Sequence, residues 1–236
     1  MSTNKVALIT GANKGLGFEI ARQLGQQGIT VVLSARNEAK GQAAVAILKA
    51  EGLDAHSVKL EVTNADDIAA LPAYFEQNFG RLDILINNAG ISLDVLGQRS
   101  PEAFRQTYET NVIAPWFIAQ ALLPLLQEAP AGRIVNHSSI LGSLTMLSTE
   151  MRDAIMPAYN SSKAALNMLT VQLANALRET RVKVNAGHPG WVKTDMGGEN
   201  APLEIVDGAK TAVALALLPD DGPTGGYFHL GQTLPW

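Results

Sequence analysis

The chain has 236 residues, of which 47% are hydrophobic and 17% charged, and its formal net charge is −4 at pH 7. This composition is typical of a globular protein and excludes a disordered chain, while the length suits a single α/β domain. The negative net charge gives no positive electrostatic field that would attract nucleic acid or an anionic membrane. The absence of cysteine excludes disulfides, thiolate metal sites and a cysteine nucleophile.

The first residues, MSTNKVALIT, enter an apolar, strand-like segment at once and show no signal-type apolar core. No apolar run approaches the roughly 20 residues that a membrane-spanning helix requires. We therefore expect a soluble, cytoplasmic protein with no membrane or nucleic-acid partner.

Strand-like and helix-like segments alternate along the chain. Apolar runs rich in β-branched residues predict strands, and segments with helical periodicity, several closed by glycine, predict helices. In chain order, strands are expected at 5–10, 29–35, 56–62, 82–90, 132–139, 181–190 and 225–230. Helices are expected at 18–28, 37–52, 64–80, 101–129 (one helix or two), 157–179 and 202–218.

Continuous apolar strands joined by helices indicate a parallel sheet that is covered on both faces. We predict an α/β fold in which residues 1–236 form a single dinucleotide-binding and catalytic domain. Its Rossmann-type, doubly wound parallel sheet should have about seven strands with helices on both faces. No linker, repeat or low-complexity tract divides the chain.

The segment TGANKGLG, residues 10–17, directly follows the first predicted strand. Gly11, Gly15 and Gly17 would let the backbone turn tightly and let a pyrophosphate approach the N-terminus of the next helix. A plain strand-to-helix turn is the alternative interpretation. The position of the glycines, between the first strand and the first helix of an α/β chain, favours the dinucleotide site.

The end of the second predicted strand carries a cation where NAD-preferring folds usually have an acid. The chain reads LSARN there, with Arg36 at the strand end, and Lys14 lies in the glycine-rich turn. Two cations favour a 2′-phosphate, and hence NADP(H) as the cofactor. The alternative is that both side chains are solvated surface charges.

Two further motifs occupy expected strand ends, which line the ligand crevice of such a sheet. NNAG at 87–90 could leave room for adenine and ribose, with an asparagine bridging adjacent strands, or could be an ordinary turn. In VNHSS at 135–139, Ser138 or Ser139 could donate a hydrogen bond into the crevice, or could cap a turn. We interpret His137 as structural because neighbouring strand residues face opposite sides. The other histidines lack metal-ligand spacing, so no metal site is expected.

AYNSSKAAL, residues 158–166, places Tyr159 and Lys163 four positions apart. On a helix these residues share one face, so that a phenol and an ammonium could act on the same small molecule. The same pair also occurs on ordinary helix surfaces, so the motif alone decides nothing.

The order of these motifs resembles the short-chain dehydrogenase/reductase family over essentially the whole chain. T-G-x-x-x-G-x-G, N-N-A-G, a strand-end serine and Y-x-x-x-K are followed by PGWVKTD at 189–195. GANKGLG, ARNEAKGQAAV, PGWVKTDM and Trp236 are most similar to the NADPH-dependent carbonyl reductases. The resemblance implies that Tyr159 is the general acid/base, Lys163 its activator, Ser139 the donor to the substrate oxygen and Asn111 the fourth member of the catalytic tetrad.

The resemblance also implies a cofactor site and a substrate side. Trp191 would line the substrate pocket together with Ser139 and Tyr159, and Glu61 stands where the family has an aspartate. Twenty positions separate Ser139 from Tyr159, more than is usual, so an insertion at 140–158 is expected to form a flap over the substrate. The implied cofactor contacts are Gly11, Asn13, Lys14, Gly15, Leu16, Gly17, Arg36, Glu61, Val62, Asn88, Ala89, Gly90, Tyr159, Lys163, Pro189, Gly190, Val192 and Thr194.

The expected activity is the reversible, NADPH-dependent reduction of a ketone or aldehyde to an alcohol. A phenol has a pKa near ~10, and a cation within ~4–6 Å can lower it by about 1–3 units, which would tune Tyr159 for proton transfer. Two other readings are a non-catalytic NADPH-binding sensor and a nucleotide-sugar epimerase or dehydratase. The sensor could dispense with the tetrad, and the epimerases generally carry a different glycine spacing and a larger C-terminal domain.

The segment 111–126 is apolar almost all round its predicted helix. A helix that packs on one side of a sheet needs only one apolar face. The neighbouring helix at 157–179 could cover the remainder, or a second copy of the chain could do so. In the resembling family these two helices commonly pack against their copies, so a homodimer or homotetramer is expected.

Overall fold

The computed structural model describes residues 5–94 and 100–236, and in this part of the chain eight strands form one sheet. Their order is β3-β2-β1-β4-β5-β6-β7-β8, with β1 to β7 parallel and β8 antiparallel to β7. The strands are β1 Val6–Ile9, β2 Thr30–Ala35, β3 Ala55–Lys59, β4 Ile84–Asn87, β5 Arg133–His137, β6 Lys183–Gly187, β7 Tyr227–His229 and β8 Gln232–Thr233.

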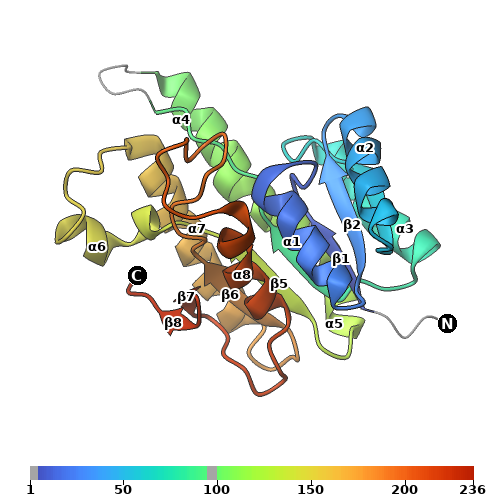
Figure 1. Ribbon diagram of the computed structural model, residues 1–236. Helices are drawn as coiled ribbons and strands as arrows, with labels where there is room; N and C mark the ends of the chain where they lie inside the picture. The colour runs from blue at the N-terminus through green and yellow to red at the C-terminus, as the bar shows by residue number, and fades with distance from the viewer. Residues whose placement is uncertain (1–4, 95–99) are drawn as a thin grey trace.

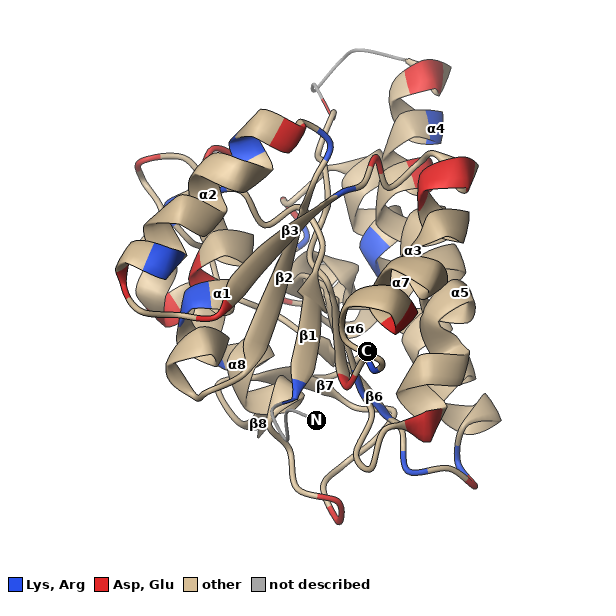
Figure 2. Ribbon diagram, turned by 90° about the vertical axis from the view of Figure 1, so that its right-hand side faces the viewer, with Lys and Arg blue, Asp and Glu red and all other residues tan. Residues whose placement is uncertain are grey.

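Helices cover both faces of the sheet, as Figures 1 and 2 show. One layer holds α1 (Gly15–Gln26), α2 (Glu38–Ala50) and α8 (Ile205–Ala216); the other holds α3 (Ala65–Asn78), α5 (Ala114–Glu128) and α7 (Pro157–Ala176). The remaining helices are α4 (Pro101–Tyr108), which leads into α5, and α6 (Leu144–Ser148), which lies between β5 and α7. The predicted α/β architecture is confirmed.

The central strands are apolar because both of their faces are buried. All four residues of β1 and of β4 are buried, and their side chains alternate between two cores. Leu8 and Leu85 face the core under α3, α5 and α7, whereas Ile9 and Ile86 face the core under α1, α2 and α8. This double burial explains why the strands read as continuous apolar runs.

The chain reverses its direction across the sheet between β1 and β4. The first three strands build one half of the sheet, and β4 then adds to the other side of β1. In an open parallel sheet, a crevice opens at this point beyond the carboxyl ends of the strands. The glycine-rich turn that follows β1 and the NNAG segment that follows β4 therefore meet at the same edge.

The structure corrects several predicted boundaries. The third strand ends at Lys59 rather than at residue 62, because its partner β2 ends at Ala35 and offers no backbone beyond that residue. The helix expected at 101–129 is interrupted by a π-helical turn, Glu109–Ile113. The strand β8 was not expected, since its two exposed residues carry no apolar pattern.

Two features are absent from the described part of the chain. No helix among residues 5–94 and 100–236 is long and apolar enough to cross a membrane. Within the same ranges, no group of three or more histidine, aspartate or glutamate side chains is arranged to hold a metal ion.

Candidate active site

A cleft of about 720 Å³ lies at the carboxyl ends of the central strands. Its walls come from the glycine-rich turn after β1, the segment after β4, the end of β5, one face of α7 and the loop after β6. These segments are far apart in the sequence and converge only because their strands are neighbours in the sheet. The predicted cofactor and catalytic positions that line it are Gly11, Lys14, Gly15, Leu16, Gly17, Asn88, Gly90, Ser139, Tyr159, Lys163, Pro189, Gly190, Val192 and Thr194.

The glycine-rich turn requires glycine at two positions for different reasons. Gly11 has a φ of +62°, which L side chains rarely adopt. At Gly17, a Cβ atom would lie 2.5 Å from Asn88 Nδ2 and 2.8 Å from the Gly11 oxygen, so any side chain would collide. The close approach brings the start of α1 against the end of β4. The free backbone N–H groups at the start of α1 face the cleft.

Hydrogen bonds tie the NNAG segment to the end of β1. The Asn88 amide nitrogen Nδ2 donates to the Thr10 carbonyl oxygen at 2.8 Å, and the Thr10 hydroxyl accepts from the backbone nitrogens of Asn88 and Ala89, both at 2.9 Å. The expected bridging of adjacent strand ends by an asparagine is therefore confirmed. The bridge fixes the floor of the cleft at the point where the strand order reverses.

Tyr159 and Lys163 lie on the first turns of α7, and both are more than nine-tenths buried. Lys163 Nζ donates to the His137 carbonyl oxygen at 2.8 Å and lies 5.6 Å from the centre of the Tyr159 ring. The pair thus shares one helix face and points into the cleft, as the four-residue spacing predicted. Burial of both side chains argues against an ordinary helix-surface pair.

An aspartate from a distant loop holds the start of α7. Met156, at the N-cap position, offers no side-chain hydrogen bond, and the free backbone nitrogens of the first turn are met by Asp94 instead. Its carboxylate accepts from the backbone nitrogens of Ala158 at 3.0 Å and Tyr159 at 2.8 Å. The sequence analysis missed this contact, because a cap supplied from 64 positions away leaves no local signal.

Burial controls the protonation of the catalytic pair. Burial raises the pKa of the Tyr159 phenol above 10.0, and a hydrogen bond with Ser139 acts in the opposite direction. Burial also lowers the pKa of the Lys163 ammonium from 10.5 to about 8. In this structure the pKa of Tyr159 lies above its usual value and not below it, because loss of hydration outweighs the hydrogen bond with Ser139.

The two serines at the end of β5 have different partners. The Ser138 hydroxyl donates to Asn167 Oδ1, on α7, at 2.6 Å. The Ser139 oxygen accepts only a long bond from the Leu141 nitrogen, at 3.3 Å, and its hydroxyl faces Tyr159. Of the two serines, Ser139 is therefore the one that can donate to a substrate in the cleft.

Asn111 lies in the π-helical turn between α4 and α5, and its side chain does not line the cleft. Its Oδ1 accepts from the Ile91 nitrogen at 2.9 Å, while its Nδ2 donates to the Ile91 oxygen at 2.9 Å and to Ser162 Oγ at 3.0 Å. The side chain therefore joins the loop after β4 to α7. A π-turn inside a helix is often found at functional sites, and here it aims Asn111 at both neighbours.

Lys14 and Arg36, the two cations predicted to bind the 2′-phosphate, lie in different places. Lys14 lines the cleft, where its ammonium pairs with the Asp195 carboxylate across the cleft; both side chains are exposed. Arg36 is exposed at the end of β2 and lies outside the cleft lining. Lys14 alone of the two thus lines the cleft in this structure.

The remaining predicted positions lie outside the cleft wall. Glu61 and Val62 follow β3, where the Glu61 carboxylate accepts from the Thr63 hydroxyl at 3.2 Å. Trp191 is half exposed, and its ring nitrogen donates to the Gly197 oxygen at 2.8 Å. The predicted positions absent from the lining are Asn13, Arg36, Glu61, Val62, Ala89, Asn111 and Trp191.

Several lining residues were not predicted. Most of them lie within the PGWVKTD segment or directly after it, in the loop that precedes α8. His137, which was interpreted from the sequence as structural, also lines the cleft. Ser138, one of the two serines considered from the sequence, also lines the cleft. The unpredicted lining residues are His137, Lys193, Asp195, Met196, Gly197, Gly198, Glu199 and Ile205.

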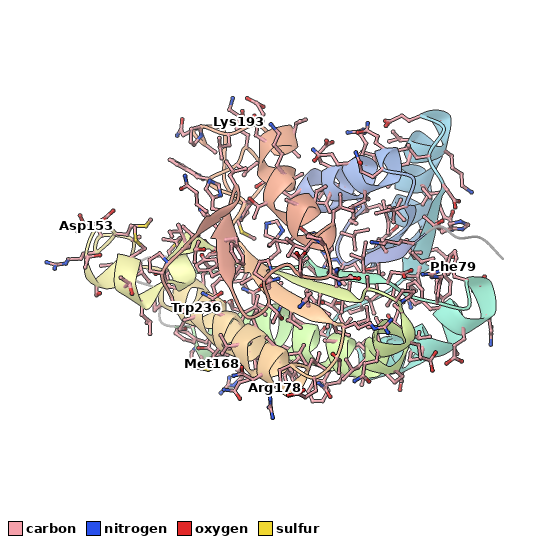
Figure 3. The ribbon with its side chains drawn as sticks, turned by 90° about the horizontal axis from the view of Figure 1, so that it is seen from below. Phe79, Asp153, Met168, Arg178, Lys193 and Trp236 are labelled. Carbon is pink, nitrogen blue, oxygen red and sulfur yellow. The ribbon has the colours of Figure 1, made fainter. Side chains whose placement is uncertain are left out.

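The insertion at 140–158 holds α6 and a short 3₁₀ turn, Ile140–Gly142. Trp236 packs against it: the Trp236 carbonyl oxygen accepts from the Thr145 nitrogen at 3.0 Å, and its ring stacks on Tyr227 with the centroids 5.4 Å apart. Figure 3 labels Trp236, together with Asp153 at the outer end of this segment. The segment follows Ser139 and leads to α7, but none of residues 140–158 belongs to the lining of the cleft.

The cleft suits a dinucleotide on its own geometry. Side chains at Gly11 and Gly17 would close the approach to the helix N-terminus, and a Cβ at Gly90 would lie 3.3 Å from Asn111 Oδ1 and 3.6 Å from Lys163 Nζ. Glycine at these places keeps a continuous path open from the turn to the catalytic pair. The path has the form that a pyrophosphate flanked by two nucleosides requires.

Comparisons with known proteins agree with this geometry. A model of the short chain dehydrogenase family matches residues 5–204. The chain is 36% identical to the pig (Sus scrofa) carbonyl reductase (NADPH) 1, over all of this chain and 96% of the relative. The NADPH-bound carbonyl reductase from chicken fatty liver has a TM-score of 0.88 and 30% identity, covering 99% of this chain and 94% of that one. The D. melanogaster carbonyl reductase Sniffer has a TM-score of 0.87 and 30% identity, with both chains fully covered.

Proposed function

The chain belongs to the short chain dehydrogenase family, and from that premise we propose that it is an NADP(H)-dependent oxidoreductase that reduces a ketone or aldehyde to an alcohol. The observation that carries the proposal is the buried pair of Tyr159 and Lys163 beside Ser139, at the end of a glycine-walled cleft. The related carbonyl reductases, whose names specify NADPH, support the choice of cofactor.

The catalytic side chains are arranged to handle a proton. Because burial raises the pKa of Tyr159, its phenol keeps its proton at neutral pH and can donate it to a carbonyl oxygen. Ser139 donates a hydrogen bond to the same oxygen, where negative charge develops. Lys163, held by the His137 carbonyl, supplies a positive charge that stabilises the phenolate left behind. NADPH, when bound, supplies the hydride.

The cofactor would lie along the cleft from the glycine-rich turn to the catalytic pair. The pyrophosphate is proposed to bind at the turn of residues 11–17, and the loop at 189–194 to hold the nicotinamide half. Asn13, Arg36, Glu61, Val62 and Ala89 are proposed contacts of the adenosine half. Arg36, together with a Lys14 released from Asp195, would pair with the 2′-phosphate.

The substrate is proposed to be apolar around its carbonyl group. Leu144, Ile155 and Trp191 expose between 56% and 70% of their surfaces. Leu144 and Ile155 lie in the chain between Ser139 and Tyr159, and Trp191 lies in the loop after β6. Such exposure is unusual for large apolar side chains and is typical of a binding surface. Shortening the 140–158 segment should change the order of preferred ketones and leave the NADPH Kd unchanged; a parallel loss of NADPH binding would contradict its role as a substrate flap.

Incubation with NADPH and a panel of ketones and aldehydes, followed at the nicotinamide absorbance, tests the activity. Oxidation of NADPH that depends on the carbonyl compound is expected, with NADH a poorer cofactor. The double variant Lys14→Ala/Arg36→Asp should reduce the preference for NADPH. NADPH binding without turnover of any carbonyl would support a sensor instead, and turnover of a nucleotide sugar without net oxidation would support an epimerase.

A homodimer or homotetramer is proposed from the outer faces of α5 and α7. Phe117 on α5 and Met168 on α7 are each more than half exposed, and Met168 projects from the outer face of its helix in Figure 3. A twofold contact of this face would cover both side chains. Light scattering should give a multiple of 25.1 kDa, whereas a mass near 25.1 kDa would contradict the assembly. A cytoplasmic location is proposed as well, and imaging of a tagged chain would test it.

A further inference from the structure

His137 has a buried polar side chain that the mechanism above does not use. It is the last residue of β5, its surface is only 9% exposed, and neither ring nitrogen has a hydrogen-bond partner among the described residues. Buried polar groups nearly always have hydrogen-bond partners. An imidazole with no partner at either nitrogen therefore calls for an explanation. His137 also lines the cleft.

The strand geometry turns this ring away from α7, and the ring lines the same cleft as Tyr159 and Lys163. Asn136, the preceding residue, faces α7 and donates to Thr170 Oγ1 at 2.8 Å, so the His137 side chain faces the other side of the sheet. Val135 on that same side belongs to the core under α8, and His137 continues its row to the edge of the cleft. The His137 carbonyl oxygen meanwhile receives the Lys163 ammonium.

The ring is uncharged at neutral pH. Burial, together with the nearby charges of Lys163 and His188, lowers the pKa of His137 from 6.5 to about 3. A neutral imidazole has one N–H donor and one nitrogen acceptor. It therefore suits an uncharged partner with hydroxyl or amide groups and offers no charge to a phosphate.

We propose that the neutral His137 imidazole hydrogen bonds to the nicotinamide riboside half of NADP(H), whose ribose hydroxyls and carboxamide supply donors and acceptors, and so positions the nicotinamide beside Tyr159. This rests on the proposed function. The adjacency of His137 to Lys163, at the end of the cleft remote from the glycine-rich turn, selects the nicotinamide half over the adenosine half. His137 is thus a positioning residue for the cofactor, beyond the Asn111, Ser139, Tyr159 and Lys163 set.

The test compares two ligands on variants of one residue. His137→Leu removes both ring nitrogens and keeps an apolar side chain of similar size, whereas His137→Asn keeps one donor and one acceptor. Dissociation constants are measured by calorimetry for NADP⁺ and for adenosine 2′,5′-bisphosphate, which lacks the nicotinamide riboside. His56→Leu is the matched control, because His56 lies on β3, where it contacts Asp54 away from the cleft.

In His137→Leu, the Kd of NADP⁺ should rise about threefold to tenfold, the range that one neutral hydrogen bond gives. The Kd of adenosine 2′,5′-bisphosphate should stay the same, and His137→Asn should recover part of the loss. An unchanged Kd for NADP⁺, or an equal loss for both ligands, would overturn the proposal. The wild-type protein distinguishes a failure of this proposal from a failure of the proposed function. If the wild-type protein does not bind NADP⁺ at all, the proposed function itself fails.

Discussion

Tyr159 is the residue on which the proposed chemistry depends. Its hydroxyl is the proton donor to the substrate, while the cofactor cleft is built mainly from backbone and glycine. Tyr159→Phe should therefore lower kcat by at least about a hundredfold, as expected for loss of a general acid, and leave the NADPH Kd within about twofold. Tyr74→Phe, which removes a hydroxyl that donates to the Ser57 carbonyl oxygen on the edge strand β3, away from the cleft, should keep full activity. Retention of more than a few per cent activity by Tyr159→Phe would exclude it as the acid.

Lys163 gives the reduction a defined pH limit. Burial lowers the pKa of its ammonium to about 8, so the charge is present below that pH and is lost above it. The phenolate that Tyr159 leaves behind is then no longer stabilised. We expect kcat/KM for carbonyl reduction to be level up to about pH 8 and to fall above it, in steady-state assays with saturating NADPH. A rate that stays level to pH 10 would show that the Lys163 charge is not required.

The residues that were predicted correctly are those whose role leaves a local pattern. Gly11 and Gly17 belong to a turn between adjacent elements, and Tyr159 and Lys163 lie one helical turn apart. Their spacing made them candidates, and the order of the motifs along the chain, through the family resemblance, gave them their roles. His137 and Asp94 were not identified, because their roles come from contacts with residues that are distant in sequence. An aspartate in a loop, or a histidine at a strand end, has the same local signal whether or not such a contact forms.

At the scale of elements, α7 depends on a cap that belongs to another segment. Asp94 satisfies two backbone nitrogens at the helix start, one of them that of Tyr159 itself. Asp94→Ala should cost about 1 kcal/mol of stability and let the first turn fray, which would lower kcat more than it weakens NADPH binding.

Ser100→Ala provides the comparison for that variant. Ser100 caps α4 by accepting from the Ala103 nitrogen at 3.1 Å, so its loss removes a similar cap from a different helix. Urea unfolding and steady-state kinetics on both variants separate the two effects. Equal loss of kcat in both would mean that Asp94 acts only through general stability.

The elements themselves were predictable, and their ends were not. Glycine stops and apolar runs indicated which segments form strands and which form helices, because these signals lie within each segment. The end of β3 depends on where β2 stops, and the π-turn at Asn111 depends on contacts with Ile91 and Ser162. Neither partner is visible from the segment alone.

At the scale of the whole molecule, two buried histidines link stability to pH. Burial lowers the pKa of His137 to about 3 and that of His188 to about 4, both from 6.5. Between pH 6.5 and 4 the unfolded chain therefore binds more protons than the folded one, and stability falls as the pH falls.

Each histidine should contribute a slope of up to about 1.4 kcal/mol per pH unit over that range. Urea unfolding at several pH values from 7 to 4.5 measures the slope. In His137→Leu the dependence should be clearly shallower, with little difference between pH 7 and 8. An unchanged slope would mean that His137 is protonated in the folded protein.

The packing of α1 against α8 has a consequence for how the molecule is made. Their facing residues are about 190 positions apart, and Gly208 lets them meet so closely that a Cβ there would lie 2.8 Å from Leu16 and 2.6 Å from Val192. During synthesis, the residues of α1 that pack against α8 stay uncovered until nearly the whole chain has left the ribosome. Such long-range closure slows folding. The nucleotide cleft is therefore among the last features to form, and the nascent chain must be protected from aggregation until α8 arrives.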